Sequence, residues 1–246
     1  MRSIRGVFFD AAGTLFETRE PVGETYARIA RAYGVDASAE AVGAGFRRTF
    51  RNAAPLAFGP GRSPEDLRRL ERNWWHGLVA KTFAGIGEFA DFQGYFNSLF
   101  DFFADPANWI ANPEALPTFR ALRECGRTIG VISNFDYRLY RILDGLGLRR
   151  WLDSIIISSE IGFAKPSAKL FEAALERHQL APAEALHVGD SEQLDVVGAI
   201  SAGMTAVLLK PELSRPFHLQ DRTAEISSLR QVLRVIGLRE ASSAGS

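Results

Sequence analysis

The stretch GVFFDAAGTLF, residues 6–16, joins an apolar run to a carboxylate and a glycine turn. Val7, Phe8 and Phe9 have the apolar, β-favouring character of a buried strand, and Asp10 follows at its end. An ionised carboxylate beside a buried strand is costly unless a cation or several hydrogen-bond donors compensate it. The sequence therefore marks Asp10 as a candidate functional residue.

Four more apolar runs lie in the C-terminal half, and helical patterns separate them. The predicted strands are residues 6–10, 128–133, 154–158, 185–189 and 204–209. The predicted helices are residues 118–125, 137–146, 169–178 and 194–202. Alternation of apolar strands with helices is typical of an α/β fold, so we predict a doubly wound, mainly parallel, Rossmann-like sheet.

Residues 18–112 have helical periodicity and no predicted strand. We expect one of the neighbouring Trp74 and Trp75 in the core and the other facing a cleft. Five phenylalanines recur at steps of three and four residues, which predicts a helix face packed inside a small bundle: Phe89, Phe92, Phe96, Phe100 and Phe103. We predict an all-helical cap over residues 18–112, inserted into an α/β core of residues 1–17 and 113–239, and a disordered tail over 240–246.

The composition excludes several classes of partner. The 246 residues carry 29 basic and 29 acidic side chains, so no basic surplus indicates a nucleic acid or a membrane surface. Cys125 has no second cysteine to pair with, and no apolar run approaches ~18 residues. We expect a cytoplasmic protein. The sequence leaves the oligomeric state open, with a monomer favoured.

Polar side chains follow four of the predicted strands. Ligands bind at the carboxyl ends of the strands in an open parallel sheet, so these side chains should share one edge. They are Asp10, Ser133 with Asn134, Lys165, and Asp190 with Asp195. Singly, each has a structural explanation, such as helix capping for an aspartate or a solvated loop charge for the lysine.

Together, these residues predict phosphoryl chemistry. Three carboxylates at one edge repel each other unless cations neutralise them, and Lys165 with Mg²⁺ would do so. The Ser133 hydroxyl and nearby backbone N–H groups would cradle a phosphate. A carboxylate such as Asp10 beside a metal-bound phosphoryl group is a competent nucleophile, and its attack forms an aspartyl-phosphate.

The order and spacing of these motifs resemble those of a known family. FFDAAGTL, VISN, Lys165 in GFAKP, and HVGDSEQLDVVGAISAGM are similar to the four motifs of the haloacid dehalogenase (HAD) superfamily, whose members are mostly phosphohydrolases. The resemblance covers residues 1–16 and about 117–210, and residues 18–112 resemble the family's helical cap. Within the superfamily, PVGETYARIARAYGV, Trp74-Trp75 and VISNFDYRL look most like the branch of haloacid dehalogenase-like hydrolase domain-containing protein 3.

The resemblance implies a role for each residue. Asp10 would be the nucleophile and an Mg²⁺ ligand, with the backbone carbonyl of Ala12 as another ligand. Thr14 would support this loop at the substrate side. Ser133 and the Asn134 backbone would bind the phosphate, and Lys165 would balance the charge at the nucleophile. Asp190 and Asp195 would bind the metal.

Position 12 departs from the phosphatase pattern. Phosphatase members carry a second aspartate there, which protonates the leaving group and then activates water, whereas Ala12 can do neither. This help is typically worth ~10²–10⁴ in rate. We expect a slow Mg²⁺-dependent hydrolase of a small phosphorylated metabolite, limited to good leaving groups such as acyl or aryl phosphates.

Alternatives remain at this stage. A phosphonatase would need a cap lysine for a Schiff base, and residues 18–112 contain only Lys81. A 2-haloacid dehalogenase needs neither a leaving-group proton nor the metal ligands Asp190 and Asp195. A protein that binds Mg²⁺ and phosphate without useful turnover would be regulatory. Another acid could also replace the missing one, and the candidates are Asp136, Glu160 and His76. Asp136 is the preferred candidate among the three, although an exposed turn aspartate is the more ordinary interpretation of it.

Overall fold

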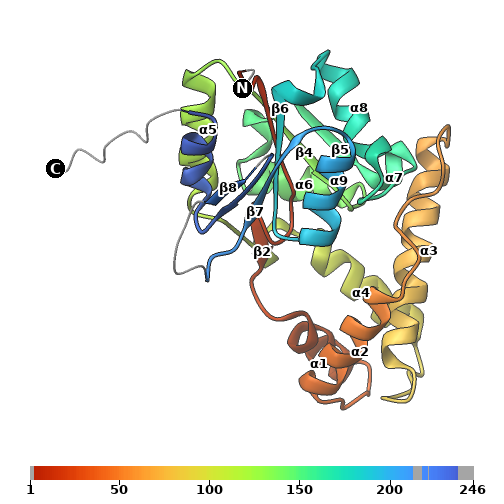
Figure 1. Cartoon of the computed structure of the whole chain (residues 1–246). Coiled ribbons are helices and arrows are strands. Elements are labelled where there is room, and N and C mark those ends of the chain that lie inside the picture. The colour runs from red at the N-terminus through yellow and green to blue at the C-terminus, as the bar shows by residue number, and fades with distance from the viewer. Residues whose placement is uncertain (1–2, 213–217, 221, 238–246) are drawn as a thin grey trace.

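The computed structural model describes residues 3–212, 218–220 and 222–237, and shows a sheet with helices on both faces (Figure 1). Seven strands form this sheet in the order β5-β4-β1-β6-β7-β9-β8. All neighbours are parallel except β8 and β9. The doubly wound, mainly parallel sheet predicted from the sequence is therefore confirmed.

Five strands of this sheet correspond to the predicted ones. They are β1 (Gly6–Phe9), β4 (Thr128–Ser133), β5 (Ser154–Ile157), β6 (Ala185–Gly189) and β7 (Thr205–Leu209). Four short strands were not predicted: β2 (Phe16–Thr18), β3 (Trp109–Ala111), β8 (His218–Gln220) and β9 (Thr223–Ile226). β2 and β3 form a separate antiparallel pair at the two ends of the helical segment. A run of three or four residues has too little periodicity to reveal a strand, and pairing with its partner strand decides it.

Helices cover both faces of the sheet. The α-helices outside residues 19–108 are α5 (Ala115–Glu124), α6 (Arg138–Gly145), α7 (Ser158–Ile161), α8 (Ala168–His178), α9 (Val197–Ser201) and α10 (Val232–Val235). The helix predicted at 118–125 begins earlier, because Pro117 lies in its first turn, where proline is tolerated. The helix predicted at 194–202 is a π-turn over Glu192–Val196 followed by α9. Single 3₁₀ turns span Pro106–Asn108, Arg149–Trp151, Pro182–Glu184 and Leu229–Gln231.

The strand sequence explains the two-sided core. Successive side chains of a strand point to opposite faces. Val7 and Phe9 belong to the apolar cluster under α5, α6 and α10, whereas Phe8 belongs to the cluster under α8 and α9. All three are fully buried, which is why β1 is apolar without interruption.

Four helices fill residues 19–108 and lie to one side of the sheet (Figure 1). They are α1 (Val22–Ala32), α2 (Ala39–Arg51), α3 (Pro64–Phe83) and α4 (Phe92–Ala104). The side chains of Ser38, Ser63 and Asp91 cap the N-termini of α2, α3 and α4. These helices have an apolar cluster of their own, built around Tyr26 and Tyr95. The exact division into core and cap at residues 17/18 and 112/113 stays a prediction, and the predicted tail at 240–246 lies outside the described residues.

Buried polar contacts join these helices to the sheet layer. Ser159 of α7 donates its hydroxyl hydrogen to Glu71 of α3, and the neighbouring Ser158 donates to the carbonyl of Leu56. The second carboxylate oxygen of Glu71 has no hydrogen-bond partner among the described residues. Burial raises the pKa of Glu71 from 4.5 to about 7, although the bond from Ser159 favours the charged form. None of the described helices is both long enough and apolar enough to cross a bilayer.

The raised pKa of Glu71 makes stability depend on pH. Between pH 4.5 and 7 the folded protein holds a proton that the unfolded chain has released, so this carboxyl lowers the free energy of unfolding as pH rises through that range. Glu71→Gln keeps an uncharged hydrogen-bonding group and should stabilise the protein at pH 8 but not at pH 4.5. Urea unfolding of both proteins at the two pH values measures this difference. The exposed Glu88→Gln is the matched control, and an equal effect of both substitutions would contradict the prediction.

Candidate active site

The predicted polar residues meet at the carboxyl ends of the central strands. Asp10 follows β1, whose neighbours in the sheet are β4 and β6. Ser133 ends β4, Asn134 follows it, and Asp190 follows β6. One atom each of Asp10, Asp190 and Asp195 can be chosen so that all three oxygens lie within 4.8 Å of one another. The prediction that these carboxylates share one edge therefore agrees with the geometry.

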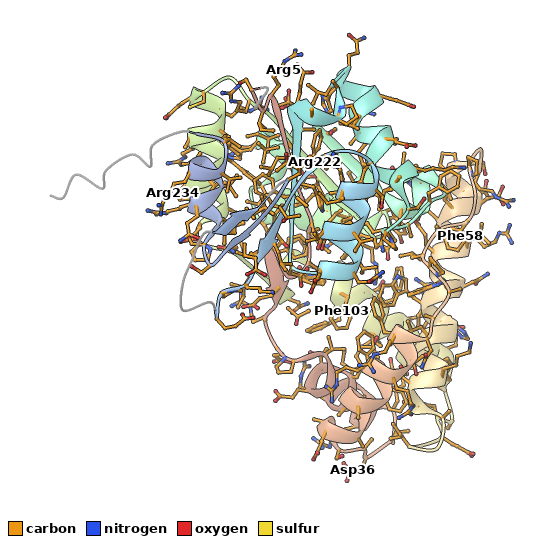
Figure 2. All side chains as sticks on the ribbon, viewed as in Figure 1. Arg5, Asp36, Phe58, Phe103, Arg222 and Arg234 are labelled. Carbon is orange, nitrogen blue, oxygen red and sulfur yellow. The ribbon has the colours of Figure 1, made fainter. Side chains whose placement is uncertain are left out.

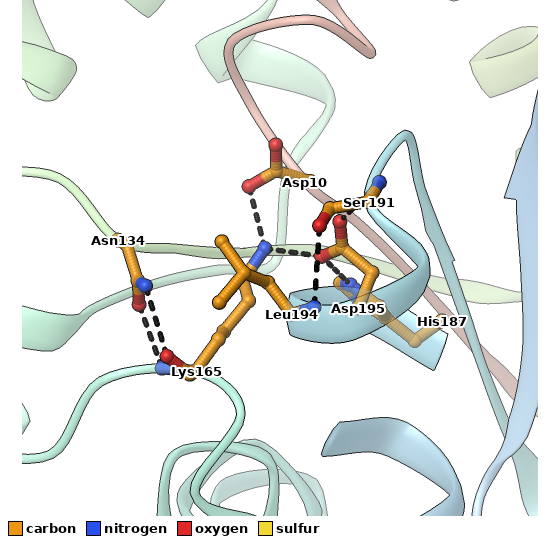
Figure 3. A network of polar contacts seen from close by, with 7 residues as sticks. All are labelled: Asp10, Asn134, Lys165, His187, Ser191, Leu194 and Asp195. Atoms are coloured by element: carbon orange, nitrogen blue, oxygen red, sulfur yellow. Dashed lines mark hydrogen bonds and ion pairs between the residues drawn. The ribbon is translucent and has the colours of Figure 1, made fainter. Parts of the chain in front are cut away.

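Lys165 lies between two of the carboxylates (Figure 3). Its Nζ is 2.6 Å from Oδ1 of Asp10 and 2.6 Å from Oδ1 of Asp195. The lysine and Asp195 are almost fully buried, and Asp10 is 8% exposed. Hydrogen bonds between charged groups are strong when water is excluded, so this ammonium fixes the positions of both carboxylates.

The charges in this group do not balance. Burial opposes the charge on Lys165, but Asp10 and Asp195 together hold its pKa above the usual value. Burial also opposes ionisation of Asp195, yet Lys165 and His187 keep the pKa of this carboxyl below its usual range. Burial and the nearby Asp195 raise the pKa of Asp10 despite its contact with the lysine. One ammonium therefore faces three carboxylates, and the excess negative charge favours a cation.

Asp190 is the outermost of the three carboxylates and is exposed. Burial of its carboxyl and the proximity of Asp10 and Asp195 raise its pKa to about 6. The loop after β1 packs directly against it: a Cβ on Gly13 would lie 2.4 Å from Asp190 Oδ2. Gly13 also has a φ of +91°, so both its conformation and this close approach require glycine.

His187 holds Asp195 in position, a contact that was not predicted from the sequence. It lies on β6, is fully buried, and places Nε2 2.8 Å from Asp195 Oδ1. Burial lowers the pKa of His187 and so favours the neutral ring. An ionised carboxylate can only accept a hydrogen bond, so the ring nitrogen that contacts Asp195, Nε2, carries the proton. The Ser191 backbone N–H donates to the other oxygen of Asp195 at 3.0 Å. A histidine inside an otherwise apolar strand was the available signal.

The other predicted residues are placed as follows. The Asn134 side chain exchanges two hydrogen bonds with the backbone of Lys165, at 2.7 and 3.2 Å, and so positions the lysine loop. Ser133 is 3% exposed at the end of β4. Thr14 is 1% exposed, and its hydroxyl has no hydrogen-bond partner among the described residues. The predicted roles of Thr14 and Ser133 in substrate binding, and of the Ala12 carbonyl in metal binding, stay predictions.

The hypothesis that Asp136 replaces the missing acid is wrong, and so is its interpretation as an exposed turn residue. Asp136 is fully buried. Both of its oxygens bind the Arg138 guanidinium, at 2.9 and 2.6 Å, and Trp75 Nε1 donates to one of them at 2.6 Å. Its oxygens are therefore already paired, and Asp136 is not among the residues that line the cavity beside Lys165.

The remaining candidate groups also lie elsewhere. Glu160 is exposed and accepts a hydrogen bond from the Tyr140 hydroxyl. The His76 ring packs edge-on against Phe92 and Phe96. Lys81, the candidate for a Schiff base, is exposed near the end of α3. None of these three residues lines the cavity beside Lys165.

That cavity bears on two expectations about aromatic residues. Trp74 and Trp75 are both half-buried and both line it, so the expected division into one core and one cleft residue is wrong. The five phenylalanines belong to the apolar cluster of the helices or pack against it, as predicted, but Phe89 precedes α4 and is not on its face. Phe96, Phe100 and Phe103 also line the cavity. Periodicity shows that a helix face is covered, but not what covers it.

The parallel sheet, the three carboxylates and the lysine at its edge define a hydrolase of the HAD type. The model of the haloacid dehalogenase-like hydrolases matches residues 4–203, and the chain belongs to this family. It is 34% identical to haloacid dehalogenase-like hydrolase domain-containing protein 3 of Bos taurus over 248 residues, with 98% of this chain and 97% of that protein covered.

Two solved structures show the range of proteins with this fold. A HAD phosphatase from Thermococcus onnurineus matches with a TM-score of 0.64 and 24% identity, over 97% of this chain and 100% of the other. A 2-haloacid dehalogenase from Pseudomonas syringae pv. Tomato DC3000 matches with a TM-score of 0.63 and 22% identity, over 95% and 98% of the two chains. At these identities the likeness establishes the fold and leaves the reaction to the site residues.

Removal of Lys165 should be strongly destabilising in the absence of added divalent cations. Lys165→Met leaves Asp10 and Asp195 buried without their counter-charge, and breaking a buried pair in this way costs about 3 kcal/mol or more. Urea unfolding in EDTA measures the loss. Lys81→Met removes an exposed lysine and should change the free energy of unfolding by less than about 0.5 kcal/mol. Similar losses for the two variants would show that the buried contacts are not the cause.

Proposed function

We propose that the protein is a Mg²⁺-dependent phosphohydrolase that acts through an aspartyl-phosphate on Asp10. The observation that carries the proposal is the group of three carboxylates, with oxygens within 4.8 Å, that faces a single lysine. Carboxylate oxygens are the ligands that Mg²⁺ prefers, and the excess negative charge would suit it. Asp10, Asp190 and the Ala12 carbonyl would hold the ion, with Asp195 supporting them.

A bound Mg²⁺ would supply charge neutralisation for the phosphate oxygens and the nucleophile. The protein's own residues would do the rest. Lys165 favours the charged form of Asp10 and orients it through the 2.6 Å contact, while His187 and the Ser191 backbone hold Asp195. The Ser133 hydroxyl and the Asn134 backbone N–H, at the end of β4, would bind the phosphate oxygens.

Ala12 restricts the substrates that this site would hydrolyse. No acid stands at position 12, and Asp136 is occupied by Arg138. The leaving group would depart as an anion without help, so esters of alcohols would react slowly and acyl or aryl phosphates faster. The second step, attack of water on the aspartyl-phosphate, would also lack a base at this position.

The site favours phosphoryl transfer over 2-haloacid dehalogenation. Displacement of a halide needs no acid at position 12, which Ala12 would permit. A 2-haloacid is itself a carboxylate, however, and here it would approach three carboxylates, two of which are paired with one lysine, Lys165. The helices α1–α4 would act as the cap that closes over the strand ends and excludes water.

Pre-steady-state hydrolysis of p-nitrophenyl phosphate tests the proposal. With Mg²⁺ we expect a burst of p-nitrophenol close to one equivalent per protein, followed by a slow steady phase, because the first step needs no proton and the second lacks a base. EDTA should abolish the burst, and so should Asp10→Asn, which is isosteric but a poor nucleophile. Mg²⁺-independent release, or release by Asp10→Asn at the wild-type rate, would refute the proposal.

Introduction of the missing acid should accelerate turnover. Ala12 is half-buried and lines the cavity, so a carboxyl group there can reach the reacting atoms. Ala12→Asp should raise the steady-state rate with an alkyl phosphate such as glycerol phosphate by about 10²-fold or more. Ala12→Asn has the same shape without an exchangeable carboxyl proton and should give no such gain. Equal rates for the two variants would show that position 12 does not limit the reaction.

A further inference from the structure

A large cavity adjoins the candidate active site. Its volume is about 920 Å³, near the upper end of the range for small-molecule sites. Asn134 and Lys165 line one end of it, together with Ala12 and Gly13 of the loop that follows Asp10. Whatever occupies the cavity therefore lies next to the nucleophile.

The walls of the cavity are aromatic. Helices α2 and α3 contribute two aromatic side chains each and α4 contributes three, the first six being Phe46, Phe50, Trp74, Trp75, Phe96 and Phe100. Phe103 of α4 also lines it and lies between the helices and the sheet (Figure 2). Arg138 lies in this wall, but its guanidinium stacks on Trp75 and Phe100 and its charge is neutralised by Asp136. The other two arginines that line it, Arg47 and Arg51, are exposed on α2, at its solvent side.

Two of the large apolar side chains that line the cavity are exposed to solvent. Among the described residues, four large apolar side chains are exposed: Phe50, Ile110, Leu194 and Val197. Phe50 is 48% exposed and Leu194 is 37% exposed, and both line the cavity, one from the helical segment and one from the sheet layer. Exposed apolar groups that line a concave site are typical of ligand binding.

We propose that the substrates are aryl phosphate monoesters whose aromatic leaving group occupies this cavity. The inference rests on the proposed function and narrows it. The lack of an acid at Ala12 selects leaving groups that are stable as anions, and the aromatic walls select, among these, phenol-type groups over small acyl groups.

The reaction balances without any further reagent. A carboxylate oxygen of Asp10 bonds to phosphorus, the bond from phosphorus to the aryl oxygen breaks, and the aryloxide leaves with the electron pair. Water then attacks phosphorus, the bond to Asp10 breaks, and phosphate leaves with both protons of the water. The aryloxide takes its proton from solvent.

Binding of stable phosphonates tests the occupant of the cavity separately from turnover. Calorimetry in Mg²⁺ would compare 2-naphthylmethylphosphonate with methylphosphonate, which has the same charged group and no ring. Burial of the aromatic group should make the first bind about thirtyfold more tightly. Turnover would be followed with acetyl phosphate, a small substrate with a good leaving group, and with phenyl and 2-naphthyl phosphates, where we expect kcat/KM about tenfold higher for the larger ring.

Variants at the exposed apolar residues locate the effect. Phe50→Ala and Leu194→Ala should each reduce the ratio of the two phosphonate affinities by about threefold, and both fold because these side chains are exposed. Ile110→Ala is the matched control. Ile110 is 39% exposed, but its neighbour Trp109 lines the cavity, so Ile110 points to the opposite side of β3. This variant should leave the ratio unchanged.

Each outcome decides one of the two proposals. Equal binding of the two phosphonates, or a ratio unaffected by Phe50→Ala and Leu194→Ala, overturns the inference about the cavity. If Asp10-dependent hydrolysis of acetyl phosphate persists in that case, the proposed function stands alone. Tight binding of the naphthyl compound without hydrolysis of any phosphate supports the aromatic ligand and refutes the phosphohydrolase. Preferred binding and turnover of the naphthyl compounds supports both.

Discussion

The buried contact of Lys165 with Asp10 and Asp195 is the constraint on which the rest of the site depends. Two 2.6 Å ion pairs join the loop after β1, the loop before α8 and the π-turn after β6. A charged group away from water tolerates little displacement, because each lost contact leaves an uncompensated charge. The lysine therefore holds three separate segments in register at the carboxyl edge of the sheet, and Asn134 fixes the lysine's own backbone.

A second buried ion pair organises the boundary with the helical segment. Arg138 and Asp136 satisfy each other, and the same guanidinium stacks on Trp75 and Phe100 of the helices. Asp136 therefore holds the arginine that packs against the aromatic wall, instead of offering an acid to the site. The two ion pairs lie at a charged end and an aromatic end of the region, which the proposals assign to a phosphate and to an organic group.

The lack of an acid at Ala12 relates the charged end of the site to its aromatic end. Because Ala12 supplies neither acid nor base, the proposed reaction would depend on the leaving group's own stability as an anion, and an aromatic ring would provide such stability. The shape of the cavity and the missing side chain at position 12 thus support the same proposal. This agreement between independent features is stronger support than either feature alone.

The sequence by itself determined the apolar strands, the α/β alternation and the strand-end residues, because each of these is written in local periodicity or in a charge next to an apolar run. It could not show the short strands β2, β3, β8 and β9, because they are only three or four residues long and are defined by their pairing partners: β2 with β3, β9 with β7, and β8 with the adjacent β9. Only the tertiary structure decided that Asp136 is occupied, that His187 supports Asp195, and that part of the α4 phenylalanine face lines a cavity. Arg138 and Asp136 lie close in sequence, as do His187 and Asp195, but which side chains point toward each other depends on how the strand ends and loops fold. A local pattern records that a side chain is covered but not by what.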